Sequence, residues 1–296
     1  MTGILVLDKP EGFTSFDAVA KVRGICREKK CGHSGTLDPM ATGVMTILLG
    51  AATRFCELLP DHDKAYEATL QLGVTTDTLD RTGKILSRCA VNAGREDFLR
   101  AAEEFRGEIT QIPPMYSAVS VNGQRLYKLA RQGVEVERPS RQVNISRLEL
   151  LSYDEEVGIY SVFVGCSSGT YIRTLVSDIG EKLGTGAMLT SLRRVKANGF
   201  DIDRAVTFEE LERAVGSGSA DSILIPVDRA VGAYPEIIVS EGQAKRFSNG
   251  GDLLLDRLTG CEAPSLYRVY SPDRRFLGLG ENDGSDSLKV KRVYTG

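Results

Sequence analysis

The distribution of apolar residues changes near residue 230, and this change favours a chain built from two units. Two stretches rich in small residues or Pro, "GSGSAD" (216–221) and "PVDRAVGAYP" (226–235), separate the two patterns. The 296 residues suffice for one large domain or two ordinary ones. We therefore expect one domain over residues 1–230 and a small, barrel-like β-rich domain over residues 233–296.

Residues 1–230 mix strand and helix patterns, which predicts an α+β fold with a mixed, mostly antiparallel sheet flanked by helices. Residues 143–154 and 159–169 are expected to form neighbouring strands joined by an acidic turn. Thr170 is expected to open a helix that Gly184 closes. The other expected elements are strands in 3–12 and 64–74 and helices in 14–30, 95–107 and 207–215.

Two further regions have short elements. Residues 115–133 are expected to contain a strand, an Asn122-Gly123 turn and a short basic helix. After residue 233 the pattern predicts short strands and one short helix. The strands are expected in 236–240, 266–271, 274–280 and 288–294, and the helix in 241–250.

The charge of the chain is uneven along its length. The net charge is −3, which argues mildly against binding to nucleic acid. Basic residues nevertheless cluster in 21–31, 121–147 and 192–196, and such segregation permits a basic face on an acidic protein. From charge alone, solvated helix faces explain these clusters equally well.

The sequence also predicts the compartment and the redox state of the thiols. We find neither a signal peptide nor an apolar run of about 20 residues, so we expect a cytoplasmic protein that does not enter the membrane. The six cysteines are scattered without a CxxC motif, which favours reduced thiols. Three cysteines within residues 26–56 flank His33, but their spacing fits no standard zinc site, and we expect no metal.

The segment "HSGTLDPMATG" (33–43) holds a single carboxylate, Asp38, in a stiff loop. Gly35 and Gly43 permit unusual backbone angles or the close approach of a ligand. Pro39 restricts the residue before it to extended or turn geometry. Asp38 is therefore either a nucleophile or general base whose partner comes from far along the chain, or a side chain that caps an Asx-Pro turn.

Several common catalytic motifs are missing from the sequence. "GTLDPMATG" lacks the lysine of a phosphate-binding loop, and no GxGxxG follows the first expected strand. There is no GxSxG motif of a serine hydrolase. Only His33 and His62 are available for histidine-rich metal catalysis. Chemistry that depends on nucleoside triphosphates, redox cofactors or metals therefore lacks its usual motifs.

Six motifs, in order, resemble those of the TruB family, the tRNA pseudouridine-55 synthases. The best match is "GHSGTLDPMATGVMTILLGAATRF" (32–55), which resembles the active-site motif of that family. The others are "LDKPEGFTS" (7–15), "DKAYEATLQLGVTTDTLDRTG" (63–83), "QIPPMYSAVSVNGQRLYKLARQG" (111–133), "CSSGTYIRTLVSDIGEKLG" (166–184) and "LTSLRRVKANGF" (189–200). The resemblance implies a pseudouridine-synthase-like catalytic domain followed by a PUA-like RNA-binding domain.

The resemblance implies the reaction and its catalytic residues. The family breaks the bond between ribose and the uracil nitrogen and rejoins the base through carbon, an isomerisation without a cofactor. Asp38 matches the essential aspartate, which attacks the sugar or the base or removes a sugar proton; nucleophile is the usual label. Arg173 matches the basic residue that pairs with it and would hold the carboxylate charged and aimed. Tyr66 matches the tyrosine that stacks on the target base and assists proton transfer.

Four more residues are assigned to substrate binding by the same resemblance. Tyr171 and Leu192 match residues that line the uracil pocket. His33 matches a histidine near the flipped nucleotide, where it would fill the space left in the RNA loop. Lys9 belongs to the Lys-Pro motif and is expected to support the active-site loop.

The implied substrate is the T-arm stem-loop of tRNA, bound by a monomer without an obligatory protein partner. An RNA-gripping insertion is expected at about 111–141. Two alternatives remain, a tRNA-folding chaperone that uses the same surface and a pseudouridine synthase that acts on another RNA. The residues expected to contact RNA phosphates are Arg125, Lys128, Arg131, Arg193, Arg194 and Lys196.

Overall fold

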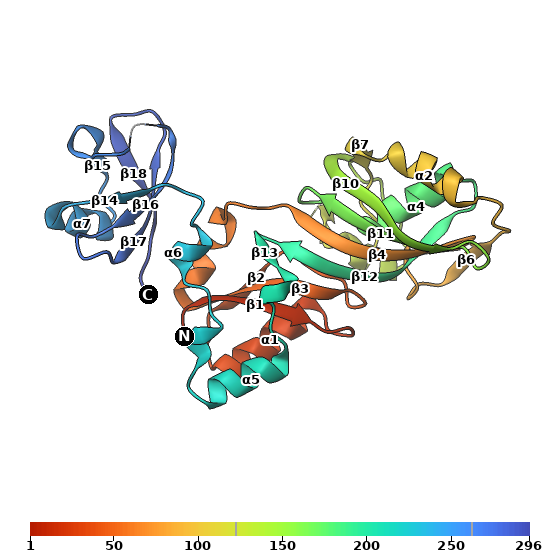
Figure 1. The fold of residues 1–296 in the computed structure, drawn as a ribbon, viewed down its shortest axis with the longest axis horizontal. Coiled ribbons are helices and arrows are strands. Elements are labelled where there is room, and N and C mark those ends of the chain that lie inside the picture. The colour runs from red at the N-terminus through yellow and green to blue at the C-terminus, as the bar shows by residue number, and fades with distance from the viewer. Residues whose placement is uncertain (122, 262) are drawn as a thin grey trace.

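The computed structural model describes residues 1–121, 123–261 and 263–296. A large sheet runs through the N-terminal part of the chain (Figure 1). Strands β3 and β12 pair in parallel, while the other described neighbours in this sheet are antiparallel. The expected mostly antiparallel sheet is thus confirmed. In spatial order the strands are β1 (Gly3–Lys9), β3 (Thr42–Leu49), β12 (Ala187–Ala197), β4 (Lys64–Leu72), β11 (Ile159–Cys166), β10 (Arg141–Asp154) and β7 (Gly107–Gln111), with β2 (Cys31–Ser34) beside β3 and β13 (Phe200–Asp201) beside β12.

The alternation of side chains along the strands divides the core between the two faces of this sheet. On one face, Leu5 and Leu7 of β1 and Met45 of β3 pack with helices into one cluster of buried residues. On the other face, Ile4 and Val6 join a second cluster. The helices of the first cluster are α1 (Ser15–Cys26), α2 (Arg95–Glu103), α4 (Ile172–Lys182) and α5 (Phe208–Gly216).

Local sequence signals explain where α1 and α5 begin. Thr14 and Thr207 each cap a helix with the side-chain hydroxyl, and an acidic residue three positions later completes a capping box. Helix α1 ends earlier than expected, because Arg27 adopts a left-handed conformation with φ of 50°. The expected start of a helix at Thr170 is also wrong, since Tyr171 is the N-cap of α4.

Smaller elements connect or extend the large sheet. Strand β5 (Val74–Thr76) pairs with β6 (Ile85–Arg88), and 3₁₀ helices occur at Gly50–Leu58, Ile202–Arg204 and Ala220–Ser222. In the insertion, β8 (Ser120–Val121) pairs with β9 (Gln124–Arg125), which leads into α3 (Leu126–Arg131). The expected Asn122-Gly123 turn includes Asn122, which lies outside the described residues.

The C-terminal part forms a second sheet with its own buried cluster, which includes Phe247, Val269 and Leu288. Phe55 of the N-terminal part packs against Phe276 and Tyr294, with ring centroids 6.1 Å apart in both pairs. We propose the domain boundary between residues 230 and 233. Helix α6 (Val227–Ala230) precedes this boundary. The elements after it are β14 (Glu236–Ile238), α7 (Glu241–Ser248), β15 (Leu253–Leu254), a 3₁₀ helix (Leu255–Arg257), β16 (Ser265–Tyr270), β17 (Phe276–Asn282) and β18 (Ser287–Val293).

No helix among the described residues is long and apolar enough to cross a membrane.

Gly43 allows β3 to approach β12 closely. It has φ of +98°, and a Cβ atom here would lie 2.2 Å from the carbonyl oxygen of Arg194. We expect Gly43→Ala to lower the free energy of unfolding by roughly 2–5 kcal/mol, because strain and overpacking add. Gly184→Ala is the control, since Gly184 has φ of +69° with open space around it. Urea unfolding should show a clearly smaller loss for Gly184→Ala; equal losses would contradict the close approach.

Candidate active site

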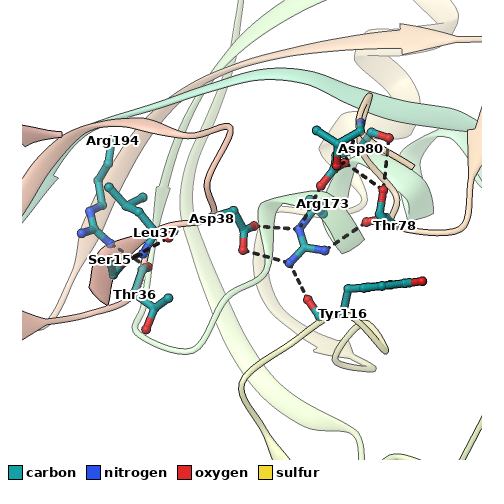
Figure 2. Close-up of polar contacts among 10 residues, drawn as sticks. Ser15, Thr36, Leu37, Asp38, Thr78, Asp80, Tyr116, Arg173 and Arg194 are labelled. Atoms are coloured by element: carbon teal, nitrogen blue, oxygen red, sulfur yellow. Dashed lines mark hydrogen bonds and ion pairs between the residues drawn. The ribbon is translucent and has the colours of Figure 1, made fainter. Parts of the chain in front are cut away.

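The loop that carries Asp38 joins β2 to β3 and is fixed by backbone hydrogen bonds. The carbonyl of Asp38 accepts from Ala41 N at 3.0 Å, so Pro39 occupies a turn that suits its fixed φ. At the start of α1, the buried Ser15 hydroxyl accepts from Leu37 N at 2.8 Å and donates to Leu37 O at 3.0 Å. The N-terminus of α1 and the loop therefore hold each other in place (Figure 2).

Lys9 supports the same loop from inside the protein. Its ammonium donates to the carbonyls of Phe13 at 2.8 Å, Pro10 at 3.0 Å and Pro39 at 3.4 Å. The expected supporting role is consistent with these contacts. Direct binding of substrate is not, because the side chain has no exposed surface.

Arg194 is the second buried cation that holds the loop. Its guanidinium donates to Val44 O at 2.7 Å, Thr36 O at 3.2 Å and Gly35 O at 3.2 Å. The side chain is 0% exposed, so the expectation that Arg194 contacts an RNA phosphate is wrong. The reason is the alternation along β12: Arg193 points to the opposite face, where it pairs with Asp8 at 2.7 Å.

The side chains of Asp38 and Arg173 point toward each other and pair (Figure 2). Arg173 Nε lies 2.8 Å from Asp38 Oδ2, and Nη2 donates to Oδ1 at 3.2 Å, a bidentate pair that fixes the carboxylate plane. The Arg173 side chain is 5% exposed, whereas that of Asp38 is 34% exposed. The carboxylate therefore faces a site that a substrate can reach. Because the Asp38 side chain bonds to Arg173, a chemical role is favoured over the alternative that this side chain only caps an Asx-Pro turn.

Arg173 is itself anchored by three further groups. Its guanidinium donates to Thr78 O at 3.0 Å and Tyr116 O at 2.9 Å, and Nε lies 3.8 Å from Asp80 Oδ2. The Asp80 carboxylate, also buried, accepts from the hydroxyls of Thr78 and Thr82. Sequence reasoning missed Asp80, although it lies inside the quoted motif at 63–83. These contacts fix the Arg173 guanidinium, and the fixed guanidinium in turn fixes the orientation of the Asp38 carboxylate.

A cavity of about 320 Å³ opens next to Asp38 and Arg173. Tyr66 of β4 and Leu192 of β12 line it, and each is 6% exposed. Burial raises the pKa of the Tyr66 phenol, partly opposed by the nearby Arg194 charge, so the ring is neutral near pH 7. A flat, apolar wall beside a fixed carboxylate is suited to a planar base.

Tyr171 also lines this cavity, and a buried amide fixes its backbone. Gln111 Oε1 accepts from Tyr171 N at 3.0 Å, and Nε2 donates to Tyr171 O at 3.3 Å. The Arg141 guanidinium lies 5.3 Å from the centre of the Tyr171 ring. Gln111 is 1% exposed and was not identified from the sequence, because a glutamine that bonds to backbone leaves no pattern.

A second hollow of about 610 Å³ adjoins the first and is also lined by Asp38 and Arg173. His33 of β2 and Tyr127 and Arg131 of α3 line it. Burial lowers the pKa of His33, so the imidazole is neutral at pH 7. The structure thus places His33 close to the site, as a predicted RNA contact rather than an acid or base.

The remaining basic residues differ in availability. Arg125, Lys128 and Arg131 are exposed on or beside α3 and stay predicted phosphate contacts. Arg193 pairs with Asp8, and Lys196 lies 3.3 Å from Asp61. Because both are already paired, an RNA phosphate would have to compete with a carboxylate for them. Among the described residues, no group of three His, Cys, Asp or Glu side chains is arranged to hold a metal ion.

Lys9 gives a test of the loop support through the pH dependence of stability. Burial lowers the pKa of Lys9 from 10.5 to about 8. Between these values the unfolded chain binds more protons here than the folded chain, so the cost of burying the charge falls as pH rises. The difference in free energy of unfolding between wild type and Lys9→Met should therefore shift in favour of wild type from pH 8 to pH 10. Urea unfolding of both proteins checks this; a difference that stays constant would contradict it.

Three family models together match residues 23–232 and 235–294 of the chain. Residues 23–172 match the "TruB family pseudouridylate synthase (N terminal domain)", residues 173–232 the "tRNA pseudouridylate synthase B C-terminal domain", and residues 235–294 "Pseudouridine synthase II TruB, C-terminal". The tRNA pseudouridine synthase B of Stutzerimonas stutzeri (strain A1501) is 47% identical over 298 residues, which cover 99% of this chain and 95% of the relative. That of Clostridium kluyveri is 41% identical over 292 residues, covering 98% and 99%.

A solved structure described as a Cbf5-Nop10-Gar1 complex has the same fold. It matches with a TM-score of 0.75 and 25% identity, covering 99% of this chain and 85% of that chain. The matches extend through both sheets and include the Asp38 loop. The chain belongs to the TruB family of pseudouridine synthases.

Proposed function

We propose that this protein is an isomerase that converts a uridine in the T-loop of tRNA to pseudouridine. The observation that carries the proposal is the bidentate pair between Asp38 and the buried Arg173, at the mouth of a cavity lined by Tyr66. Relatives named tRNA pseudouridine synthase B, at 41–47% identity over nearly the whole chain, support tRNA as the substrate.

The reaction balances within the substrate. The bond between N1 of uracil and C1′ of ribose breaks, and a bond forms between C5 and C1′. One proton leaves C5 and one proton is gained at N1. The protein therefore needs a group that stabilises or captures the separated sugar or base, and a group that moves a proton. No electron acceptor or activated co-substrate is required.

Asp38 captures the separated sugar or base in two of the three mechanisms, and in the third it removes a proton from the sugar instead. Whether it attacks C1′, attacks the base or removes a sugar proton, the carboxylate has to be charged and correctly aimed. Arg173 provides the aim, and its bonds to Thr78 O and Tyr116 O keep it fixed while Asp38 reacts. Preorganised charge of this kind costs no reorganisation during the reaction.

The shape of the site suits one nucleotide that has left its stack. A base flipped out of RNA loses stacking energy, which the Tyr66 and Leu192 walls restore in part. The exposed Arg125, Lys128 and Arg131 are predicted to hold the RNA phosphates near the opening. We further propose that the enzyme acts as a monomer in the cytoplasm, where tRNA is used, and its free cysteines suit that reducing compartment.

The first experiment uses purified protein and an unmodified T-arm stem-loop with excess chelator. We expect wild type to form pseudouridine at the T-loop uridine, detected by carbodiimide labelling and primer extension. Asp38→Asn should lower turnover by at least about 10³-fold while the Kd for RNA stays within about threefold, because the amide keeps the shape but not the charge. Asp203→Asn, at an exposed site, is the control. Binding without turnover by wild type would favour the chaperone function or another target RNA.

Tyr66→Phe tests the proton-transfer role separately from stacking. The phenyl ring keeps the apolar wall, so the Kd for RNA should remain within about threefold. Loss of the hydroxyl should slow product formation by roughly 10²-fold or more if the phenol moves the proton. Single-turnover rates measure this directly. A rate equal to that of wild type would leave Tyr66 only its stacking role.

A further inference from the structure

Among the described residues that line the cavity, Lys64 is a cation without an ion pair to a carboxylate. Lys64, the first residue of β4, lines the same cavity as Asp38 and Tyr66 and is half-buried. Arg173 and Arg194 are occupied by carboxylates and carbonyls, as described above. Within the part of the chain that the structure describes, the Lys64 ammonium has neither an ion pair nor a hydrogen bond. A half-buried ammonium without a partner is unfavourable unless a ligand supplies the anion.

The neighbours of Lys64 on the sheet do not neutralise it. Its partners in register are Cys166 on β11 and Ala197 on β12, and neither carries a carboxylate. Asp63 precedes it in the chain, but this side chain is exposed and the two are not within ion-pair distance.

The end of the Lys64 side chain also lies close to a second positive charge. A Cβ atom built on Gly35 would lie 3.4 Å from Lys64 Cε and 3.5 Å from Arg194 Nη1. Both cations therefore converge on the same point of the loop. Burial, followed by the charge of Arg194, lowers the pKa of Lys64, which is the expected sign for an ammonium that lacks its anion.

The spacing along β4 indicates what that anion is. Lys64 and Tyr66 are two residues apart on one strand, so their side chains share a face about 7 Å apart. A base that stacks on Tyr66 belongs to a nucleotide whose phosphate lies at the far side of its ribose. We propose that Lys64 binds the RNA phosphate next to the flipped uridine and so fixes how far the nucleotide enters the cavity. This inference rests on the proposed function, since it requires the base to lie against Tyr66.

The test measures RNA binding in an Asp38→Asn background, where turnover does not interfere. Lys64→Met removes the charge at similar length, Lys64→Arg keeps it, and Lys182→Met is the control because Lys182 already pairs with Glu104 at 2.7 Å. We expect Lys64→Met to weaken binding about tenfold and to reduce the slope of log affinity against log salt by roughly 0.7–0.9. Lys64→Arg should retain the slope, and Lys182→Met should change neither quantity.

A modified RNA identifies the phosphate. A neutral methylphosphonate replaces, one at a time, the phosphate on the 5′ or the 3′ side of the target uridine. At the phosphate that Lys64 contacts, the methylphosphonate should weaken binding to the Lys64 protein about as much as Lys64→Met does. In the Lys64→Met variant the same methylphosphonate should cause no further loss, because a coupled pair is lost only once. An unchanged salt slope in Lys64→Met, or losses that add at both phosphates, would overturn the contact.

Turnover by wild type on the same unmodified RNA separates this inference from the proposed function. Product from wild type with no coupling at Lys64 would refute the phosphate contact alone. Coupling without any product would refute the T-loop assignment while the phosphate contact stands.

Discussion

The buried guanidinium of Arg173 is the interaction on which the site depends. It joins the Asp38 loop, the Thr78–Asp80 turn and Tyr116 of the insertion, which are distant in the sequence. A buried charge is tolerated only when its partners are all in place, so the three segments have to assemble together. The same requirement leaves the Asp38 carboxylate in one orientation, and the catalytic geometry is therefore a consequence of satisfying a buried cation.

Two other buried cations, Lys9 and Arg194, act on the loop in a different way. Both donate to backbone carbonyls, so they fix the path of the chain and not a particular side chain. Arg194 can do so because Gly43 lets β3 run beside β12 in the one parallel pairing of the described part of the large sheet. Sheet topology, one glycine and two cations thus position the loop before any substrate arrives.

The sequence was sufficient for the fold class, for most elements and for the loop with Asp38, because apolar periodicity and turn residues are local signals. The site residues that differ from expectation do so for two reasons. Residues 192–196 resemble a basic cluster in the sequence, but they lie within β12, where alternation sends Arg193 and Arg194 to opposite faces. The charges hide the strand pattern, so the sequence alone does not distinguish the buried Arg194 from an RNA contact. Gln111 and Asp80 act through contacts across the fold, which no local pattern records.

Pairing of cations within the protein bears on how an acidic protein can act on RNA. Several arginines and lysines near the site are held by carbonyls or carboxylates, so few remain for phosphates. Lys64 and the exposed cations of α3 are among those left over, and Lys64 and Arg131 line the two hollows beside Asp38. Each phosphate contact carries its own salt dependence, and a small number of contacts gives a shallow one. We therefore propose that recognition rests mainly on the shape of the RNA loop and on the fit of one flipped base, because those interactions do not require net positive charge.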